Sequence, residues 1–359
     1  MQESNNQKFN HLKIHTQYSI CEGAIKIDDL KDFCKENKIN SVGLSDTSNL
    51  CGSLEFSENI SKAGSQPIIG TQINFSYENT TGLLPLIAIN KSGYKRILEM
   101  SSQSYLLNKS TSEPNLNISE LLNSSEGIIV FSGSINGLFG KLFNKGKLED
   151  INKLYKNLSS KFGDKFYLEI QRHGDNNEVE FEKNNLKESA DLKIPIIATN
   201  EVFYINKNMY EAHDALMCIG KKSYINDKNR FKYTNQHYFK SSEEMSNLFF
   251  DLPEALQNNY NLPFRCNFRP ETSDPVLPNI SSEKGGDADE ILLKDSEEGL
   301  KEKFLKVFNI EEINLSKSDK YKKYKARLDH ELKIITEMKY ASYFLIVSDY
   351  IKWAKNNDI

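Results

Sequence analysis

The sequence predicts an α/β fold, a distorted seven-stranded (βα) barrel, followed by a mainly helical segment. Three observations predict it. Short apolar runs alternate with helical patterns up to about residue 204, and helical patterns alone continue beyond it. No glycine-rich phosphate turn follows the first strand, as a dinucleotide-binding fold would require. Seven strands also exceed one half of a doubly wound sheet, so a barrel of βα units fits better.

The seven strands are short apolar runs, several of them rich in isoleucine and valine. They are expected at 11–15, 41–46, 67–75, 83–90, 127–133, 166–171 and 194–204. Helical patterns lie between most of them; in "IDDLKDFCKEN", for example, Leu30, Phe33 and Cys34 fall on one helical face. These helices are expected at 27–37, 52–64, 92–102, 148–162 and 177–191. The alternation favours a mainly parallel sheet with right-handed crossovers.

A change of composition marks a domain boundary late in the chain. The stretch "FRPETSDPVLPNISSEKGGDADE" (268–290) is rich in Pro, Gly, Ser and acids, which is typical of a linker. Helices are predicted after it at 290–308, 318–338 and 341–357. The last of them is apolar along much of its length, so it should pack against something.

Composition and charge indicate a soluble globular protein. The net charge is −4, so the average surface gives no sign of nucleic-acid binding. The cysteine count of 5 is odd and contains no CxxC pair, which favours reduced thiols and a cytoplasmic location. No signal sequence and no apolar run long enough to span a membrane occurs, so no membrane is expected among the partners.

Polar residues end several of the predicted strands. They are His15, Asp46, Gln72, His173 and Glu201. Active sites of βα barrels lie at the carboxyl ends of the strands, so this set could form a metal site on one rim. Loops are polar in any case, and for a single residue that explanation is the better one. For the whole set, a metal site and ordinary polar loops explain the pattern about equally well until the residue types are compared with known metal ligands.

Five long motifs stand out along the chain: "FNHLKIHTQYSICEGAIKIDDL", "LSDTSNLCGSLEF", "AGSQPIIGTQINF", "IPIIATNEVFYI" and "ELKIITEMKYASYFLIVSDYIKWAKNNDI". These motifs resemble the N-terminal third of the alpha subunit of bacterial DNA polymerase III, a C-family replicative polymerase. They follow one another in family order over nearly the whole chain. The resemblance implies a polymerase and histidinol phosphatase (PHP) domain at 7–270, a linker at 271–289, and the start of the polymerase palm at 290–359.

In that family the complete protein is a DNA-directed DNA polymerase, a nucleotidyltransferase that uses Mg²⁺. Its implied partners are a DNA template-primer, deoxynucleoside triphosphates, a proofreading exonuclease subunit and the sliding clamp of the replicase. The paired palm aspartates that hold two metal ions are expected beyond Ile359. The chain should therefore be inactive by itself, and no cofactor is firmly expected for it; we expect no catalytic residue within it.

The family's PHP metal site is only partly matched. His15, Glu22, His173 and Glu201 keep residues that could bind a metal, as remnants of the ligand set. At five other ligand positions, the family's metal ligand is replaced: Lys13, Thr47, Gln72, Leu83 and Phe203. An ammonium cannot coordinate a metal ion, and an incomplete shell lowers affinity steeply. The interpretation is a degenerate PHP scaffold domain without its own chemistry, although one weakly held ion stays possible.

Two alternatives remain beside the scaffold. One is a metal-dependent PHP-family phosphoesterase or 3′-5′ exonuclease, which the ligand losses oppose, and the other is a non-catalytic protein-binding module. If the scaffold is right, Lys13 could replace a missing cation by pairing with Glu22 or Glu201. Of the other histidines, His213 is expected at a helix surface, and His237 is expected to be solvated or structural.

Overall fold

The structure is a computed structural model of the chain. It describes residues 8–108, 113–123, 125–273, 287–308, 315 and 317–359. Two compact units divide at Thr272 and Ser273, and each is described by itself. Most of the predicted linker at 271–289 lies outside the described residues. Unit 1 carries every residue of the candidate site.

The first sheet of unit 1 has four parallel strands in the order β11-β1-β2-β4. Their bounds are His11–Ile14 (β1), Ser41–Leu44 (β2), Gln66–Ile68 (β4) and Glu201–Val202 (β11). In the register of β1 and β11, Lys13 lies opposite Glu201. The first and last strands of the predicted barrel are therefore neighbours, which brings distant residues to one rim.

The second sheet follows the order β10-β9-β8-β6-β5-β3, with β7 paired to β5. Its strands are Asp46–Thr47 (β3), Gly70–Tyr77 (β5), Thr80–Ala88 (β6), Leu116–Asn117 (β7), Ile128–Phe131 (β8), Phe166–Ile170 (β9) and Ile196–Ala198 (β10). Strand β6 runs antiparallel to both β5 and β8, and the other pairs are parallel.

The α/β class is confirmed, with parallel and antiparallel pairs in the second sheet. The predicted strand 67–75 is divided into β4 and β5, and 194–204 into β10 and β11, so that each half joins a different sheet. No strand pair in the described part of the chain closes the two sheets into one ring. The distortion of the barrel is therefore larger than the alternation of elements indicates.

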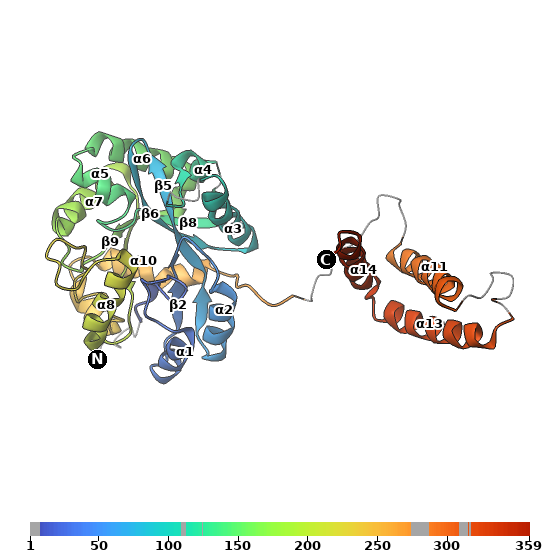
Figure 1. Cartoon of the computed structure of the whole chain (residues 1–359). Coiled ribbons are helices and arrows are strands. Elements are labelled where there is room, and N and C mark those ends of the chain that lie inside the picture. Colours follow the sequence, from blue (N-terminus) through green and yellow to red (C-terminus); the bar gives the residue numbers. More distant parts are fainter. Residues whose placement is uncertain (1–7, 109–112, 124, 274–286, 309–314, 316) are drawn as a thin grey trace. The chain divides into compact units, whose positions relative to one another are not determined.

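Helices surround the sheets of unit 1 on the outside, as Figure 1 shows. They are α1 (Ile27–Glu36), α2 (Ser53–Lys62), α3 (Lys91–Leu106), α4 (Ile118–Leu122), α5 (Leu138–Asn144), α6 (Leu148–Phe162), α7 (Glu178–Leu192), α8 (Tyr210–Lys221), α9 (Ser242–Leu248) and α10 (Pro253–Asn261), with short 3-10 turns at Gly163–Lys165, Lys207–Met209 and Leu262–Arg265. The bounds of the five predicted helices agree with these bounds to within one or two residues, except at the end of α3. The predicted ranges were 27–37, 52–64, 92–102, 148–162 and 177–191.

The core forms because each helix turns one apolar stripe toward the sheets. In α6 the buried residues Ile151, Leu154 and Leu158 recur at three- and four-residue intervals and join the cluster that includes Ile14 and Leu44. Parallel strands covered on both faces are apolar throughout, and β8 (IIVF) is buried at all four positions. This packed interior holds the strand ends that carry the candidate site.

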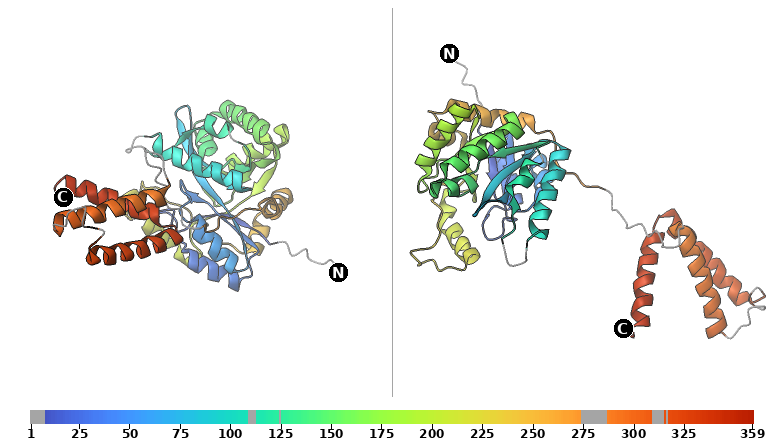
Figure 2. Two further views of the ribbon diagram at one scale, coloured as in Figure 1. Left: turned by 90° about the vertical axis from the view of Figure 1, so that its right-hand side faces the viewer. Right: turned by 90° about the horizontal axis from the view of Figure 1, so that it is seen from above.

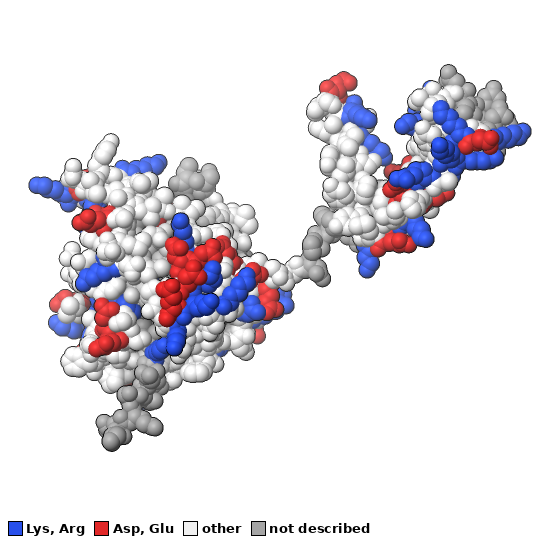
Figure 3. All heavy atoms as spheres, turned by 90° about the horizontal axis from the view of Figure 1, so that it is seen from below, with Lys and Arg blue, Asp and Glu red and all other residues white. Residues whose placement is uncertain are grey.

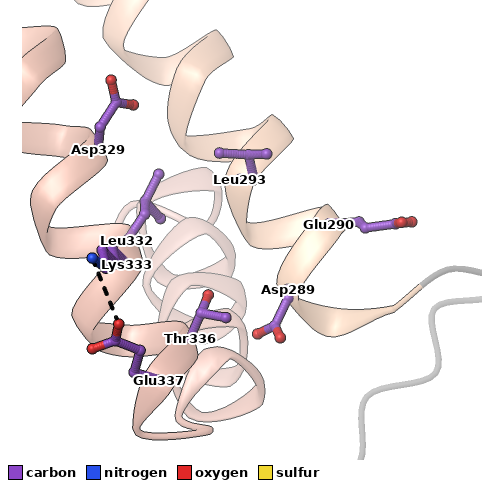
Figure 4. A pocket seen from close by; sticks show the side chains of 8 residues that line it. All are labelled: Asp289, Glu290, Leu293, Asp329, Leu332, Lys333, Thr336 and Glu337. Carbon is purple, nitrogen blue, oxygen red and sulfur yellow. Dashed lines mark ion pairs between the residues drawn. The ribbon is translucent and has the colours of Figure 1, made fainter.

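Among its described residues, unit 2 has the long helices α11 (Ala288–Val307), α13 (Asp319–Glu337) and α14 (Ala341–Asn356), shown in Figure 2. Its small core consists of Leu292, Leu332, Ala341 and Leu345. A groove of about 400 Å³ opens between α11 and α13, with an apolar floor and a mostly acidic rim (Figure 4). It is lined by Asp289, Glu290, Leu293, Asp329, Leu332, Lys333, Thr336 and Glu337.

The surface charges of unit 1 are mixed. Figure 3 shows acidic and basic side chains side by side on the face seen from below, with broad uncharged areas around them. This agrees with a net charge of only −4 for the whole sequence. Among the described residues, no helix combines the length and apolar character needed to cross a bilayer.

Candidate functional site

A buried lysine lies at the centre of the candidate site. Lys13 projects from β1, and its Nζ lies 3.2 Å from Oε1 of Glu169 on β9 and 3.4 Å from Oε1 of Glu201 on β11. The side chains of Lys13 and Glu169 are 1% and 0% exposed. Two carboxylates on two different sheets therefore share one ammonium group, which we call the Lys13 triad.

The charges of the triad support one another. Burial alone would lower the pKa of Lys13, but the two glutamates outweigh it and raise that pKa above its usual value. Burial alone would likewise raise the pKa of Glu201, yet Lys13 and His15 hold it well below its usual range. Both groups stay charged because each opposes the other's desolvation.

His15 extends the triad toward the rim. Its Nε2 donates to Oε1 of Glu201 at 3.0 Å, and the amide of Gln72 donates to the same oxygen at 2.6 Å. Phe203 stacks on the imidazole with ring centroids 4.4 Å apart. One carboxylate oxygen thus faces lysine, histidine and glutamine donors, and an aromatic ring covers the histidine.

A third carboxylate, that of Asp46, holds the loop after β1. Asp46 accepts hydrogen bonds from the backbone N–H of Thr16 at 2.6 Å, from the Thr16 hydroxyl at 2.7 Å and from the Ser19 hydroxyl at 2.7 Å. Burial raises the pKa of Asp46, and these hydroxyls offset part of that rise. Ser19 also contacts Nδ1 of His15 at 3.2 Å. Asp46 therefore acts as a structural acceptor.

His173 lies in a separate part of the rim. Its ring stacks on His237 with centroids 4.0 Å apart, and its Nε2 lies 3.0 Å from Oδ1 of Asn200. That same oxygen accepts a hydrogen bond from the buried Lys240 at 3.0 Å. Burial lowers the pKa of His173 to about 3, with Lys240 acting in the same direction, so the ring stays neutral.

The structure brings two of the four predicted remnants, His15 and Glu201, into contact with two of the lost ligand positions. His15, Glu201, Gln72 and Lys13 form one contact network, and Phe203 packs on it. The remaining positions lie around it or away from it. Glu22 accepts from the Thr47 hydroxyl at 2.5 Å, His173 contacts the backbone N–H of Glu201 at 3.3 Å, and Leu83 pairs with Asn74 between β6 and β5.

Three residues of the site have a place that the sequence did not indicate. Glu169 is a partner of Lys13 because β9 lies beside β10 and faces β1, and no spacing in the chain reveals this pairing. The expectation for His213 was wrong: it is 2% exposed, with its Nε2 2.8 Å from the carbonyl oxygen of Glu22. His237, which is 1% exposed, is structural rather than solvated.

These contacts do not fit a metal cluster. Over the described ranges, no group of three or more His, Cys, Asp or Glu side chains is placed to hold a metal ion. The centre between Glu169 and Glu201 holds an ammonium group, and a second positive charge would be repelled there. Nε2 of His15 and Oε1 of Glu201, which could bind a cation, are instead engaged with each other and with Gln72.

Comparison with known proteins agrees with this architecture. Residues 11–173 match the family model described as "PHP domain". Residues 290–359 match "Bacterial DNA polymerase III alpha NTPase domain". The first match covers β1 to β9 together with His173, and the second covers most of unit 2.

Curated relatives match along the whole chain. DNA polymerase III subunit alpha of Caulobacter vibrioides is 37% identical over 367 residues, covering 100% of this chain and 31% of that protein. The subunits of Rickettsia bellii and Haemophilus influenzae are 37% and 32% identical and cover 98% and 99% of this chain. The chain spans about 30% of the length of the first two relatives. The chain therefore belongs to the DNA polymerase III alpha subunit family, as its PHP domain followed by part of the region that the second model describes.

Proposed function

We propose that this chain is the non-catalytic front end of a cytoplasmic replicative DNA polymerase, and that its PHP domain is a scaffold without hydrolytic activity. The observation that carries the proposal is the Lys13 triad. An ammonium group lies 3.2 Å and 3.4 Å from two buried carboxylates at a position where the family's metal-binding pattern has a histidine. The lysine supplies the positive charge that the rim needs without offering a reactive centre.

If the PHP domain is a scaffold without a metal ion, other side chains must occupy the positions of the metal ligands. Gln72 donates to Glu201 where a carboxylate would bind metal, and Phe203 packs on His15 where a second histidine would lie. Both replacements add packing or hydrogen bonds to the rim. This supports a rim maintained for stability, and it counts against the alternative of a metal-dependent phosphoesterase or 3′-5′ exonuclease.

The test for hydrolysis is an assay of the chain with bis(p-nitrophenyl) phosphate and with single-stranded DNA, in Mn²⁺, Zn²⁺ or Mg²⁺. We expect no turnover above that of a Lys13→Ala variant or of buffer. Metal-dependent cleavage that disappears in both His15→Ala and His173→Ala would contradict the scaffold proposal and support the phosphoesterase.

We further propose that 290–359 begins a polymerase palm. In the complete protein, Mg²⁺ held by palm carboxylates would supply the two-metal chemistry of nucleotidyl transfer, with a DNA template-primer and deoxynucleoside triphosphates as substrates. A proofreading exonuclease subunit and the sliding clamp are the proposed protein partners. By itself, the chain is expected to extend no primer.

A chimera tests this role directly. Replacing the matching segment of the Caulobacter vibrioides subunit with this chain should give a protein that extends a primed template with Mg²⁺, while the isolated chain does not. Extension by the isolated chain would overturn the proposal. So would a monodisperse, folded chimera that does not extend the template while the unmodified parent subunit, prepared in the same way, does.

A further inference from the structure

Five exposed apolar side chains, which we call the apolar patch, lie on two segments of unit 1 that the scaffold role does not use. Its side chains are Ile20 (84% exposed), Ile219 (71%), Tyr224 (85%), Ile225 (55%) and Phe231 (46%). Four of them belong to the end of α8 and the loop that follows it, which we call the 219–232 loop. Ile20 belongs to the loop after β1.

The two segments are held against each other by backbone contact. A Cβ added to Gly220 would lie 2.7 Å from Cβ and 2.9 Å from the carbonyl oxygen of Cys21, so only glycine allows this approach. Ile219 and Ile20 are the neighbours of these two residues in the sequence. The apolar side chains from α8 and from the β1 loop therefore lie on adjoining parts of the surface.

An ion pair and hydrogen bonds hold the 219–232 loop against α8. The guanidinium of Arg230 donates to both carboxylate oxygens of Asp214 on α8, at 2.6 Å and 2.5 Å, and its Nε donates to the carbonyl oxygen of Ile225 at 3.3 Å. Lys232 lies 3.4 Å from the same carboxylate. These contacts hold the loop in a defined shape, so the outward position of its apolar side chains is part of the fold.

The charges around the patch are mostly positive. Arg230 and Lys232 share the single carboxylate of Asp214, and Lys221, Lys222 and Lys228 are exposed nearby with Asp227 among them. A lysine from another element adds to this field. Burial lowers the pKa of Lys141 on α5; Glu113 opposes this shift, and the neighbouring charges of Lys145 and Lys221 add to it. This repulsion would be relieved by an anionic partner.

We propose that this patch is a docking surface for an acidic, amphipathic segment of a partner protein. Its isoleucine side chains would contact apolar anchors of the segment, and Lys221, Lys222 and Lys228 would pair with acids beside those anchors. The inference goes beyond the scaffold role, because it assigns a partner chemistry to a surface outside the rim. It does not depend on the identity of the partner.

Aliphatic side chains favour a protein partner over a nucleic acid. Single-stranded DNA is bound mainly by aromatic rings that stack on bases together with basic side chains. Tyr224 and Phe231 could stack on bases, but the other three apolar side chains (Ile20, Ile219 and Ile225) are aliphatic and cannot, and such a mixture of apolar and charged side chains is typical of protein interfaces.

The test is a selection of a random phage-displayed peptide library on the full chain, with counter-selection on an Ile219→Ser/Ile225→Ser variant. Enriched peptides should combine large apolar residues with Asp and Glu. In fluorescence anisotropy, the best peptide should bind that variant and a Lys221→Glu/Lys222→Glu variant at least about tenfold more weakly than the wild type. All substituted side chains are exposed, and unchanged melting temperatures confirm that the variants fold.

The matched control is Leu106→Ser/Leu107→Ser, which removes two side chains that are 81% and 72% exposed at the end of α3. It should leave peptide binding unchanged. The proposal is overturned if no acidic peptide is enriched, or if the control weakens binding as much as the patch variants. It is also overturned if labelled oligo(dT) binds more tightly than the peptide and loses that binding in the patch variants.

Discussion

The surroundings of Lys13 explain most directly how the buried charges of the candidate site are stabilised. A buried ammonium group is stable only when its desolvation is repaid, and here two carboxylates from different sheets face it. Removing the lysine would leave Glu169 and Glu201 buried without a counter-charge. The residue therefore supports the rim in the way that a bound cation would.

Lys13→Met should consequently destabilise unit 1 strongly. Breaking a buried ion pair by removing one partner costs roughly 3–5 kcal/mol, because the remaining charge is left uncompensated. Urea denaturation followed by circular dichroism measures the loss. A second substitution, Glu169→Gln, should recover part of it, since it removes one of the two unpaired charges.

Lys31→Met is the matched control for this prediction. Its amine lies 3.2 Å from Asp28 in an exposed pair, and the denaturation midpoint should not change. Equal midpoints for Lys13→Met and the wild type would contradict the role of Lys13. So would a Lys13→Met/Glu169→Gln variant that is less stable than Lys13→Met alone.

His11 predicts how stability changes with pH. Burial lowers its pKa to about 3, and its Nε2 lies 2.8 Å from the carbonyl oxygen of Lys240. The unfolded chain binds a proton at the usual histidine pKa while the folded chain does not, so stability falls as pH drops below about 6.5. For this group alone, the loss between pH 7 and pH 5 is about 2 kcal/mol.

The measurement is urea denaturation at pH 5, 6 and 7 on the wild type and on His11→Leu. The variant should lose less stability on acidification, whatever its stability at pH 7. The triad does not obscure the comparison. Glu201, whose pKa is lowered in the folded chain, stabilises the fold until the pH falls through that lowered pKa. Lys13, whose pKa is raised, stabilises the fold until the pH rises through that raised pKa. Parallel pH profiles would refute the assignment to His11.

At the scale of elements, the sequence predicted the strands well and their directions less well. The run "LLPLIAIN" follows "PIIGTQINF" without a helix between them, and β6 accordingly returns antiparallel to β5 through a turn in which Glu78 has φ +48°. Periodicity locates apolar strands, but it does not encode their partners. The contact between Lys13 and Glu169 depends on sheet order, which is why the sequence indicated Glu201 and missed Glu169.

Strand β2 makes an element-scale prediction through Gly43. A Cβ there would lie 2.6 Å from the carbonyl oxygen and 2.7 Å from Cα of Leu12 on β1, so Gly43→Ala must push the two strands apart. Overpacking of this kind costs roughly 1–3 kcal/mol. The same strand displacement should disturb Lys13, which follows Leu12, and a lower denaturation midpoint of unit 1 is the expected result.

Gly299→Ala in α11 is the contrasting change. Nothing lies within 4 Å of the added Cβ, and alanine favours the helix interior by roughly 1 kcal/mol over glycine. Gly43→Ala should therefore lower stability while Gly299→Ala raises that of unit 2. A Gly43→Ala variant as stable as the wild type would show that β1 and β2 do not approach as closely as described.

At the scale of the whole molecule, the two units should differ in stability. Unit 1 has a large apolar core, whereas the core cluster of the described part of unit 2 contains only Leu292, Leu332, Ala341 and Leu345. Backbone amides with few buried apolar neighbours open more readily. Hydrogen exchange read by mass spectrometry should show α11, α13 and α14 exchanging well before β5 and β6, and equal protection would contradict this.

We propose that the Lys13 triad takes the place of a metal centre in the PHP domain. Calorimetric titration of the full chain with Mn²⁺ and with Zn²⁺ tests it most directly, with Lys13→Met and His15→Ala as companions. We expect no stoichiometric heat of binding for the wild type and the same result for His15→Ala. Tight binding to the wild type that is abolished by His15→Ala and by His173→Ala would contradict it.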